Sequence, residues 1–478
     1  MATTDQEPRA QGRPSIEELA DLLRGRVVVP GDEDYDAARR VWNGMIDRRP
    51  ALIVMCAGVG DVMAAVTYAR EHGLPIAVRG GGHNVAGTAV ADDAVVVDVS
   101  RMRGVRVDPA RGTVWAQAGC TWADVDRETQ PFGLAVPGGV VSETGIAGLT
   151  LSGGLSGQRR AHGMTIDNLV GCDIVTADGR LLHASADEHP ELFWALRGGG
   201  GNFGVVTAFE YQAHRHGPEI FVTKVFYPVE QGREILTRWR DAVTRMPEAV
   251  TSEAVYWTFP AVPDIPEPMH HAPVLVVIAN VVGPVAEAEA LTRPLRELGE
   301  PIVDASGPTT YVDEQRALDP LFGAGRRYYW KGLYLDALGD DAIDVITERA
   351  LQSPSPHSPI VVRHLGGAMG RVTAEETAFG DRSAPFHLSV DATWDDPAQD
   401  ALNVLWTQEF IAAAQRFSSG KLYLNFAGML EEGDAALRTT FGRNYARLVD
   451  VKTAYDPGNV FRFNPNIAPR GTATGIAA

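Results

Sequence analysis

Glycine is concentrated in three stretches of the chain, and this distribution constrains the fold more than any other feature of the sequence. The stretches are residues 80–82, 138–163 and 198–204. Closely spaced glycines let a backbone approach a ligand and adopt positive φ, so that N–H groups converge on an anion such as a pyrophosphate. Three such stretches near one another predict one lobe with an extended ligand lying along it.

The first stretch follows a short apolar run, residues 75–78, which is typical of a buried strand. With an expected strand at residues 50–56 and an expected helix at 61–71, it forms a β-α-β unit, which usually binds its ligand at the carboxyl ends of its strands. His83 comes directly after the glycines. A phosphate-binding loop alone does not need a histidine there, whereas a cofactor attached through the imidazole ring does. The alternative is a surface turn with a chance histidine.

Motifs and composition exclude several classes of protein. No stretch contains G-x-x-x-x-G-K-[ST], which argues against a nucleoside triphosphatase, and none is a clean G-x-G-x-x-G opening a helix, so a Rossmann fold is only weakly indicated. The net charge of −18 argues against nucleic acid or an anionic membrane as a partner, and no apolar run is long enough to span a bilayer.

Cysteine and histidine spacing indicates neither disulfides nor a metal site. Cys56, Cys120 and Cys172 form no C-x-x-C pair, and H-E-x-x-H is absent. Residues 1–14 are polar and lack the apolar core of a signal peptide, so we interpret them as a disordered tail. These features favour a cytoplasmic location.

The chain has 478 residues, which favours two or more lobes, and its character changes near residue 214. From there to residue 426 glycine thins, and strands are expected at residues 274–282, 326–336, 360–364, 386–392 and 421–426. This pattern predicts a second α+β lobe with an antiparallel sheet. In the strand at 326–336, large side chains occupy both faces, so one face is expected to be covered and the other to line a site.

The end of the chain returns to polar, amide-rich sequence. A helix is expected at residues 448–455, followed by a turn and an extended stretch that contains Asn464 and Asn466. We expect this segment to pack back on the first lobe.

Taken in order, these motifs resemble the FAD-linked oxidoreductases of the berberine-bridge-enzyme-like group, within the vanillyl-alcohol-oxidase superfamily of PCMH-type flavoproteins. The resemblance covers the first lobe almost continuously and both ends of the chain. The matching motifs are Arg79-Gly-Gly-Gly-His83-Asn84, Thr144-Gly145-x-x-Gly148, Gly153-Gly154, Arg160-x-x-Gly163, Asp167-Asn168, Thr176-Ala-Asp-Gly179, Leu196-Arg-Gly-Gly-Gly200 with Asn202-Phe-Gly204, Tyr423-x-Asn425, Asp456-Pro-x-Asn459 and Asn464-x-Asn466.

The resemblance implies an α+β fold with an FAD-binding domain at residues 15–213 and 427–478 and an inserted substrate-binding domain at 214–426. It also implies FAD joined through its 8α-methyl to the ring of His83. The residues expected to bind the cofactor are Arg79, Gly80, Gly81, Gly82, His83, Asn84, Pro137, Gly138, Ser142, Thr144, Gly145, Gly148, Gly153, Gly154, Asn168, Val175, Tyr423, Asn464 and Asn466.

Two positions depart from the family pattern. Many members carry a second link to the flavin through a cysteine, and Val141 occupies that position here. The resemblance therefore implies a flavin attached through histidine alone. Ser156-Gly157 stands where the family usually has glycine followed by tryptophan, which puts the local packing around the ring in doubt.

The family's reaction moves a hydride from a C–H bond to flavin N5 while a base takes a proton from the adjacent O–H or N–H. Tyr423 and Asn425 lie two apart on an expected strand and so share a face. In relatives a tyrosine in this motif is the proposed base. Because an unperturbed tyrosine has a pKa of about 10, that role needs hydrogen bonds or a cation, for which Lys331 and Arg363 are candidates. The alternative for Tyr423 is a core aromatic residue.

Further candidates for catalysis or substrate contact are Tyr329, Lys331, His364 and His387, each of which an ordinary structural role explains equally well. Aromatic residues of the second lobe, Tyr256, Trp257, Tyr328, Tyr329 and Trp330, suggest a pocket for a ring-bearing molecule and are also common in any core.

The expected reaction is oxidation of an alcohol or amine on a secondary metabolite, sugar or alkaloid. Thr144 occupies the position that gates oxygen access in relatives, and its small size favours O2 as acceptor with H2O2 as product. The alternatives are a dehydrogenase or oxidative cyclase on the same scaffold, and a flavin-binding protein without turnover. A small-molecule substrate and O2 are the only partners implied.

Overall fold

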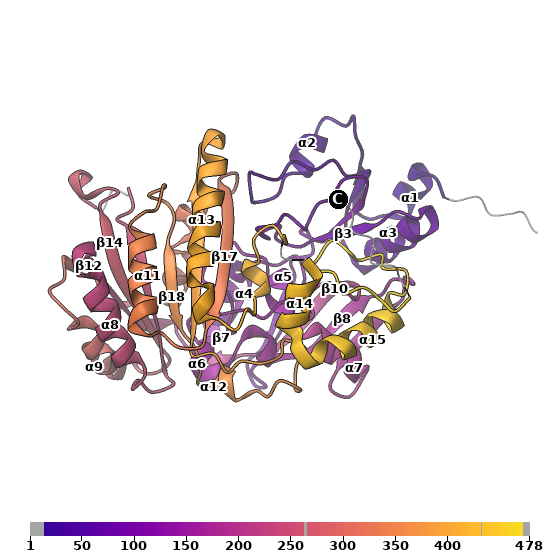
Figure 1. Cartoon of the computed structure of the whole chain (residues 1–478). Coiled ribbons are helices and arrows are strands. Elements are labelled where there is room, and N and C mark those ends of the chain that lie inside the picture. Colours follow the sequence, from indigo (N-terminus) through magenta and orange to yellow (C-terminus); the bar gives the residue numbers. More distant parts are fainter. Residues whose placement is uncertain (1–13, 262–264, 432, 472–478) are drawn as a thin grey trace, which may run out of the picture.

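The computed structural model describes residues 14–261, 265–431 and 433–471, so the expected tail lies outside the described residues except for Pro14. The predicted α+β class with antiparallel sheets is confirmed. Two lobes lie side by side: one carries the start and end of the chain, and the other carries the middle (Figure 1).

The first sheet contains the β-α-β unit that the sequence predicted, formed by β2, α3 and β3. It has the order β1-β2-β4-β3, and β4 pairs in parallel with both β2 and β3, so it lies between the two predicted strands. The connecting helix ends at Gly73, whose φ of 65° is the left-handed conformation that favours glycine. The elements are β1 (Arg26–Val28), β2 (Leu52–Met55), α3 (Val59–His72), β3 (Ile76–Arg79) and β4 (Val95–Asp98).

A second, antiparallel sheet completes the first lobe in the order β5-β6-β10-β8-β9. The helix α15 (Tyr445–Tyr455) packs on the same core, to which Leu448 and Phe461 contribute. The buried Lys452 pairs with Asp456 and donates to the carbonyl of Asn202, which fixes the end of the chain on this lobe. The strands are β5 (Val105–Asp108), β6 (Thr113–Gln117), β8 (Leu169–Val175), β9 (Leu181–Ser185) and β10 (Val205–Gln212).

The second lobe is built on an eight-stranded antiparallel sheet in the order β15-β12-β14-β13-β18-β19-β17, with β16 beside β12. Helices cover one face (Figure 1), where they bury side chains such as Trp239 and Phe410. The main strands are β12 (Glu219–Pro228), β13 (Val250–Thr258), β14 (Pro273–Val281), β17 (Arg327–Leu335), β18 (Ile360–His364) and β19 (Phe386–Trp394); β15 (Val303–Asp304) and β16 (Gly307–Thr310) are short. The helices are α8 (Gly232–Val243), α9 (Val285–Arg296), α11 (Asp340–Ala350) and α13 (Asp400–Ala414).

The strand expected at residues 421–426 is wrong. The chain is irregular up to Tyr423 and then forms a short 3-10 helix, Leu424–Phe426, closed by the Phe426 N–H on the Tyr423 carbonyl at 2.8 Å. The alternating apolar residues that suggested a strand pack into two different hydrophobic clusters. Leu424 packs into the first lobe, whereas Tyr423 and Phe426 pack between the lobes.

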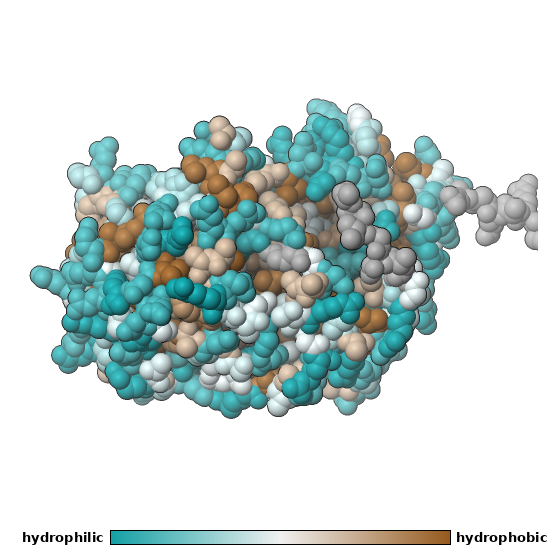
Figure 2. Space-filling view, in the orientation of Figure 1, coloured by the Kyte–Doolittle hydropathy of each residue, from teal (hydrophilic) through white to brown (hydrophobic). Residues whose placement is uncertain are grey.

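The described surface is largely hydrophilic on the face drawn in Figure 2, with hydrophobic patches that include the upper part of α13. Leu402 and Leu405 of α13 are about half exposed. None of the helices in the described part of the chain is both long enough and apolar enough to cross a bilayer.

Candidate functional site

A cavity of about 460 Å³ lies between the two lobes. The glycine stretches form one side of it, and the sheet face of the second lobe that the helices leave uncovered forms the other. It therefore has the size and the interlobe position typical of a ligand site. Predicted site residues that line it are Gly80, Gly81, Gly82, His83, Asn84, Thr144, Gly145, Gly148, Tyr423, Asn425 and Asn464.

The first two glycine stretches meet backbone to backbone at the wall of the cavity. A Cβ atom on Gly81 would lie 2.5 Å from the backbone nitrogen of Gly145, and a Cβ atom on Gly145 would lie 2.5 Å from that of Gly81. Both neighbours are backbone atoms that cannot move aside, so only glycine fits at either position. The contact joins the loop that carries His83 to the loop that carries Thr144.

Arg79 holds the first glycine loop from behind and does not line the cavity. Its guanidinium pairs with Asp98 at 2.7 Å and donates to the Ala38 carbonyl at 2.6 Å. Asp98 lies directly opposite Arg79, at the carboxyl end of the neighbouring strand. The pair is buried, so Arg79 acts on a ligand through the loop that it positions.

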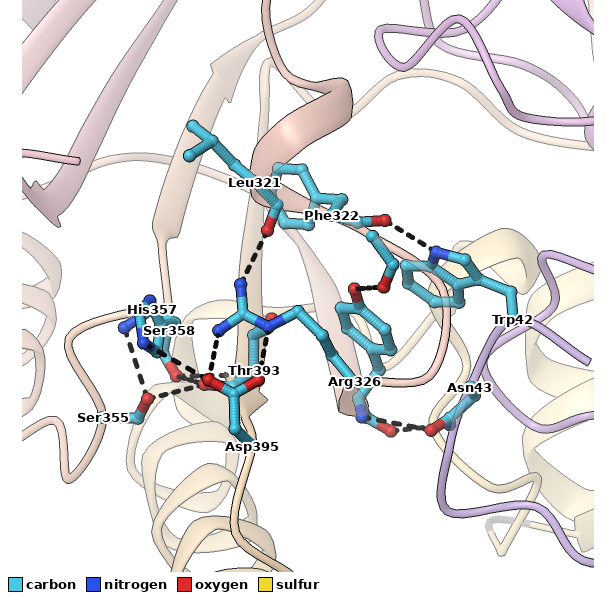
Figure 3. Close-up of polar contacts among 12 residues, drawn as sticks. Trp42, Asn43, Leu321, Phe322, Arg326, Ser355, His357, Ser358, Thr393 and Asp395 are labelled. Carbon is cyan, nitrogen blue, oxygen red and sulfur yellow. Dashed lines mark hydrogen bonds and ion pairs between the residues drawn. The ribbon is translucent and has the colours of Figure 1, made fainter. Parts of the chain in front are cut away.

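His83 lines the cavity with its ring stacked on Trp42, at 5.2 Å between ring centroids. Trp42 stacks in turn on Tyr328 of the second lobe and donates from Nε1 to the Phe322 carbonyl at 2.8 Å. Figure 3 shows Trp42 and Asn43 reaching across to this part of the second lobe. Burial lowers the pKa of His83 to about 4, so the imidazole is neutral at physiological pH and a ring nitrogen is available as a nucleophile.

Tyr423 lies at the far wall of the cavity, and its hydroxyl oxygen accepts two hydrogen bonds. The donors are the Gly154 backbone N–H at 3.1 Å and Asn425 Nδ2 at 3.0 Å. Asn425 Nδ2 also donates to the Leu149 carbonyl at 3.2 Å, which fixes the orientation of the amide. Although Tyr423 and Asn425 are not on a strand, the 3-10 turn still brings their side chains together.

The pKa of Tyr423 reflects opposing influences. Burial raises it, while Asn425, the Gly154 N–H and the positive charge of Arg363 lower it, and burial has the largest effect. Among the described residues none accepts a hydrogen bond from the Tyr423 hydroxyl, so the oxygen is surrounded by donors alone. These donors favour the phenolate and offset part of the effect of burial, which still leaves the pKa of Tyr423 above its ordinary value.

Several residues predicted to bind the cofactor stand behind the wall of the cavity. The Ser142 N–H and hydroxyl both bond to Asp319 of the second lobe, and Asn168 donates to the Met164 carbonyl. The others outside the lining are Pro137, Gly138, Gly153, Gly154, Val175 and Asn466. They shape the loops that reach the cavity.

Tyr329 and Lys331 are not brought to the cavity, contrary to expectation. Both interact with Glu431, and Gln408 of α13 donates to the Tyr329 hydroxyl, so they lie on the helix-covered face of β17. Trp330, between them, lines the cavity instead. The sequence could not assign the faces of β17 because both carry large side chains.

The remaining candidates are His387, His364 and Arg363, of which only Arg363 lines the cavity. His387 is fully buried and its ring contacts that of Tyr423, at 5.7 Å between centroids, but it does not line the cavity. His364 is buried outside the lining as well, and its carbonyl accepts from Arg159. Arg363 does line the cavity, and of the two candidate cations it is the one that acts on Tyr423.

Sequence reasoning missed Trp42 and the acidic residues that line the described cavity, Glu253, Glu314 and Asp391. Trp42 lies in an irregular segment before β2 that carries no periodic pattern. Asp391 lies within the strand expected at residues 386–392, whereas Glu253 lies in β13, which was not predicted; a charge inside an otherwise apolar, β-rich run is the signal that could have identified both.

The residues fit an FAD molecule. The glycine cradle approaches the cavity with backbone alone, and the neutral His83 lines it. Asn464 Nδ2 donates to Gly201, which joins the end of the chain to the third glycine stretch. None of the described lining residues is a cysteine, and all three cysteines are buried and free.

The substitution Gly148→Ala is expected to reduce flavin binding without destabilising the fold. Gly148 lies in α5 (Ile146–Leu151) and lines the cavity, and a Cβ atom there meets nothing within 4 Å. We expect the variant to be as thermally stable as the wild-type apoprotein, because alanine favours a helix, yet to incorporate less flavin, because the methyl group enters the cavity. Flavin absorbance per mole of protein measures the effect, and full incorporation would place the cofactor away from Gly148.

Two family models match the chain. The one described as FAD binding domain matches residues 50–185, which include His83 and the second glycine stretch. The one described as Berberine and berberine like matches residues 422–468, which include Tyr423 and both terminal asparagines. The matches fall on the parts of the chain that form the first lobe and the turn carrying Tyr423.

Relatives match along nearly the whole chain. It is 30% identical to the uncharacterized FAD-linked oxidoreductase YgaK of Bacillus subtilis, covering 94% of this chain and 97% of the relative. It is also 30% identical to (R)-6-hydroxynicotine oxidase of Paenarthrobacter nicotinovorans, covering 94% and 98%. The solved structure of 6-hydroxy-D-nicotine oxidase from Arthrobacter nicotinovorans has a TM-score of 0.84 at 29% identity, covering 94% and 98%.

A more distant structure shares the fold. Glucooligosaccharide oxidase from Acremonium strictum, which is described with a 6-S-cysteinyl, 8α-N1-histidyl FAD, has a TM-score of 0.84 at 22% identity. The match covers 95% of this chain and 99% of that one.

Proposed function

The chain belongs to the berberine-bridge-enzyme-like FAD-linked oxidoreductases, and we propose that it is an oxidase whose flavin is attached through His83 alone. Its substrate is an alcohol or amine on a secondary metabolite, sugar or alkaloid. Bound FAD supplies the hydride acceptor at N5, and O2 receives the electrons to give H2O2. The main observation behind this proposal is that one cavity is lined by both His83, whose imidazole is neutral, and Tyr423, whose hydroxyl oxygen accepts two hydrogen bonds.

The side chains at the cavity support attachment through a single residue. The imidazole of His83 is neutral and is held by its stack on Trp42, so it can form a bond without first losing a proton from a cationic ring. Val141, at the position where relatives have a second attachment, lines the cavity with a side chain that cannot form such a bond.

Tyr423 is the proposed base. Its oxygen is held by the Gly154 N–H and by Asn425, so it is fixed in place and its negative charge is stabilised by two donors. Removal of the substrate's O–H or N–H proton by Tyr423 makes the adjacent C–H bond a better hydride donor. Steady H2O2 formation coupled to substrate loss tests the reaction. Turnover with artificial dyes alone would favour the dehydrogenase alternative.

Thr144→Leu tests oxygen as the acceptor. Thr144 lines the cavity beside the Gly81–Gly145 contact, so a larger side chain there narrows access to the flavin from this wall. We expect O2-dependent reoxidation to slow by about tenfold or more while reduction by substrate and turnover with a dye are retained. Stopped-flow measurement of the two half-reactions separates these effects, and equal slowing of both would show that Thr144 does not control oxygen access.

A further inference from the structure

Arg363 is a buried cation whose guanidinium donates no hydrogen bond within the described part of the chain. It is 6% exposed and lines the cavity. Its nearest carboxylates are Glu253, at 3.6 Å from Nε, and Asp391, at 3.8 Å from Nη2, both beyond hydrogen-bond distance. Nη1 is buried and has no partner among the described residues. Buried guanidinium donors without partners are rare in folded proteins and call for a ligand or another explanation.

Arg159, which also pairs with Glu253, is an arginine whose guanidinium is fully engaged by the protein and so provides a comparison. It is fully buried, and its guanidinium donates to Glu253 at 2.8 Å and to the carbonyls of Ser156 and His364 at 3.0 Å each. Its donors are therefore occupied by the protein. Arg363 differs in that its guanidinium forms only the two longer ion pairs and that the residue lines the cavity.

The two acidic residues near Arg363 are already engaged. Glu253 forms a close ion pair with Arg159, in which Arg159 donates to its carboxylate. Asp391 accepts a hydrogen bond from the Ser389 hydroxyl. Burial raises the pKa of Asp391 to about 6, so this carboxyl gains a proton at a higher pH than an ordinary aspartate does. Both carboxyl groups thus have another partner, and neither comes within hydrogen-bond distance of Arg363.

Arg363 lies in the part of the cavity wall that is close to the proposed base, Tyr423. In the antiparallel sheet it is directly opposite Glu253 on one side and His387 on the other, and His387 contacts Tyr423. Its guanidinium carbon lies 5.3 Å from the centre of the Phe426 ring. Apolar residues of adjacent positions, Val255 and Val361, line the same wall. Beside the proposed base, this wall therefore combines apolar side chains with the Arg363 guanidinium and the two carboxyl groups next to it.

We propose that Arg363 binds a carboxylate of the substrate, which makes the substrate a ring-bearing carboxylic acid that also carries the oxidised alcohol or amine. This inference rests on the proposed function and specifies its substrate class. A carboxylate matches the planar fork of a guanidinium and forms charge-assisted hydrogen bonds with it. The rings of Phe426 and Trp330 then flank the apolar part of the molecule.

Benzoate tests this assignment without turnover. The holoenzyme is titrated with benzoate and with the neutral isostere benzamide, and binding is followed by calorimetry and by changes in flavin absorbance. We expect benzoate to bind about 10- to 100-fold more tightly than benzamide, and Arg363→Met to abolish that preference while leaving benzamide unchanged. Arg363→Lys keeps the positive charge but loses the planar pair of donors, so it should retain part of the preference for benzoate.

Equal binding of benzoate and benzamide by the wild-type protein would overturn the inference, and this comparison decides the matter even if Arg363→Met fails to fold. Loss of the preference in Lys224→Met instead of Arg363→Met would overturn it as well, because Lys224 is the other lysine or arginine among the described residues that line the cavity. Flavin content measured on the same preparations distinguishes the two proposals. Protein without FAD contradicts the oxidase, whereas protein with FAD but no benzoate preference contradicts the role of Arg363 alone.

Discussion

Replacing Tyr423 with phenylalanine is expected to lower kcat by about 10²- to 10⁴-fold, the range that general base catalysis contributes. The variant loses the oxygen that accepts from Gly154 and Asn425, but Asn425 keeps its bond to the Leu149 carbonyl, so the turn that carries it stays in place. Flavin content should not change, because His83 lies elsewhere in the cavity. Reduction of the flavin by substrate under anaerobic conditions measures the affected step directly.

Tyr334→Phe is the matched control. Tyr334 is also a buried tyrosine, and it packs with Tyr423 between the lobes. Its hydroxyl has no hydrogen-bond partner among the described residues and it does not line the cavity. Its loss should leave kcat within about twofold of the wild-type value. If Tyr423→Phe reduced the flavin as fast as Tyr334→Phe, Tyr423 would be a core aromatic residue and the base would have to be another group.

Gly145→Ala is expected to cost about 1–3 kcal/mol of folding free energy and to remove most of the bound flavin. The added Cβ atom would lie 2.5 Å from the backbone nitrogen of Gly81 and 2.7 Å from its Cα atom. Relief of this clash requires the two glycine loops to separate, which displaces the loop that carries His83. Denaturant unfolding of the apoprotein and flavin absorbance of the purified protein measure the two effects.

Gly60→Ala provides the control for a glycine that has no such contact. Gly60 lies in α3, and a Cβ atom there meets nothing within 4 Å, so the substitution should be neutral or slightly stabilising. Wild-type stability and flavin content in Gly145→Ala would show that the loops can separate without loss, and would refute the backbone contact as the basis of the cradle.

Local patterns were enough to predict the first lobe. The apolar run before Gly80 and the glycines themselves specify a strand that ends in a loop which only glycine can form, so the neighbourhood of His83 follows from sequence order. The close approach of Gly81 to Gly145 could not be predicted, because it joins residues far apart in the sequence. Its existence explains why both stretches need glycine.

The second lobe was harder to predict, for two physical reasons. Strand alternation indicates two faces but not which one is covered, and β17 has aromatic residues on both, so Tyr329 and Lys331 were assigned to the wrong one. Around Tyr423 the alternating apolar residues pack into different cores and imitate a strand. Only tertiary contacts distinguish these cases.

In the proposed enzyme, the flavin is attached to His83 and to no other residue. The direct measurement is acid precipitation of the purified protein followed by mass spectrometry of its tryptic peptides, of which the peptide spanning residues 80–101 contains His83 and no cysteine. We expect the yellow colour to remain with the pellet and the flavin to be found on that peptide alone. Flavin released to the supernatant, or found on another peptide, would contradict the claim.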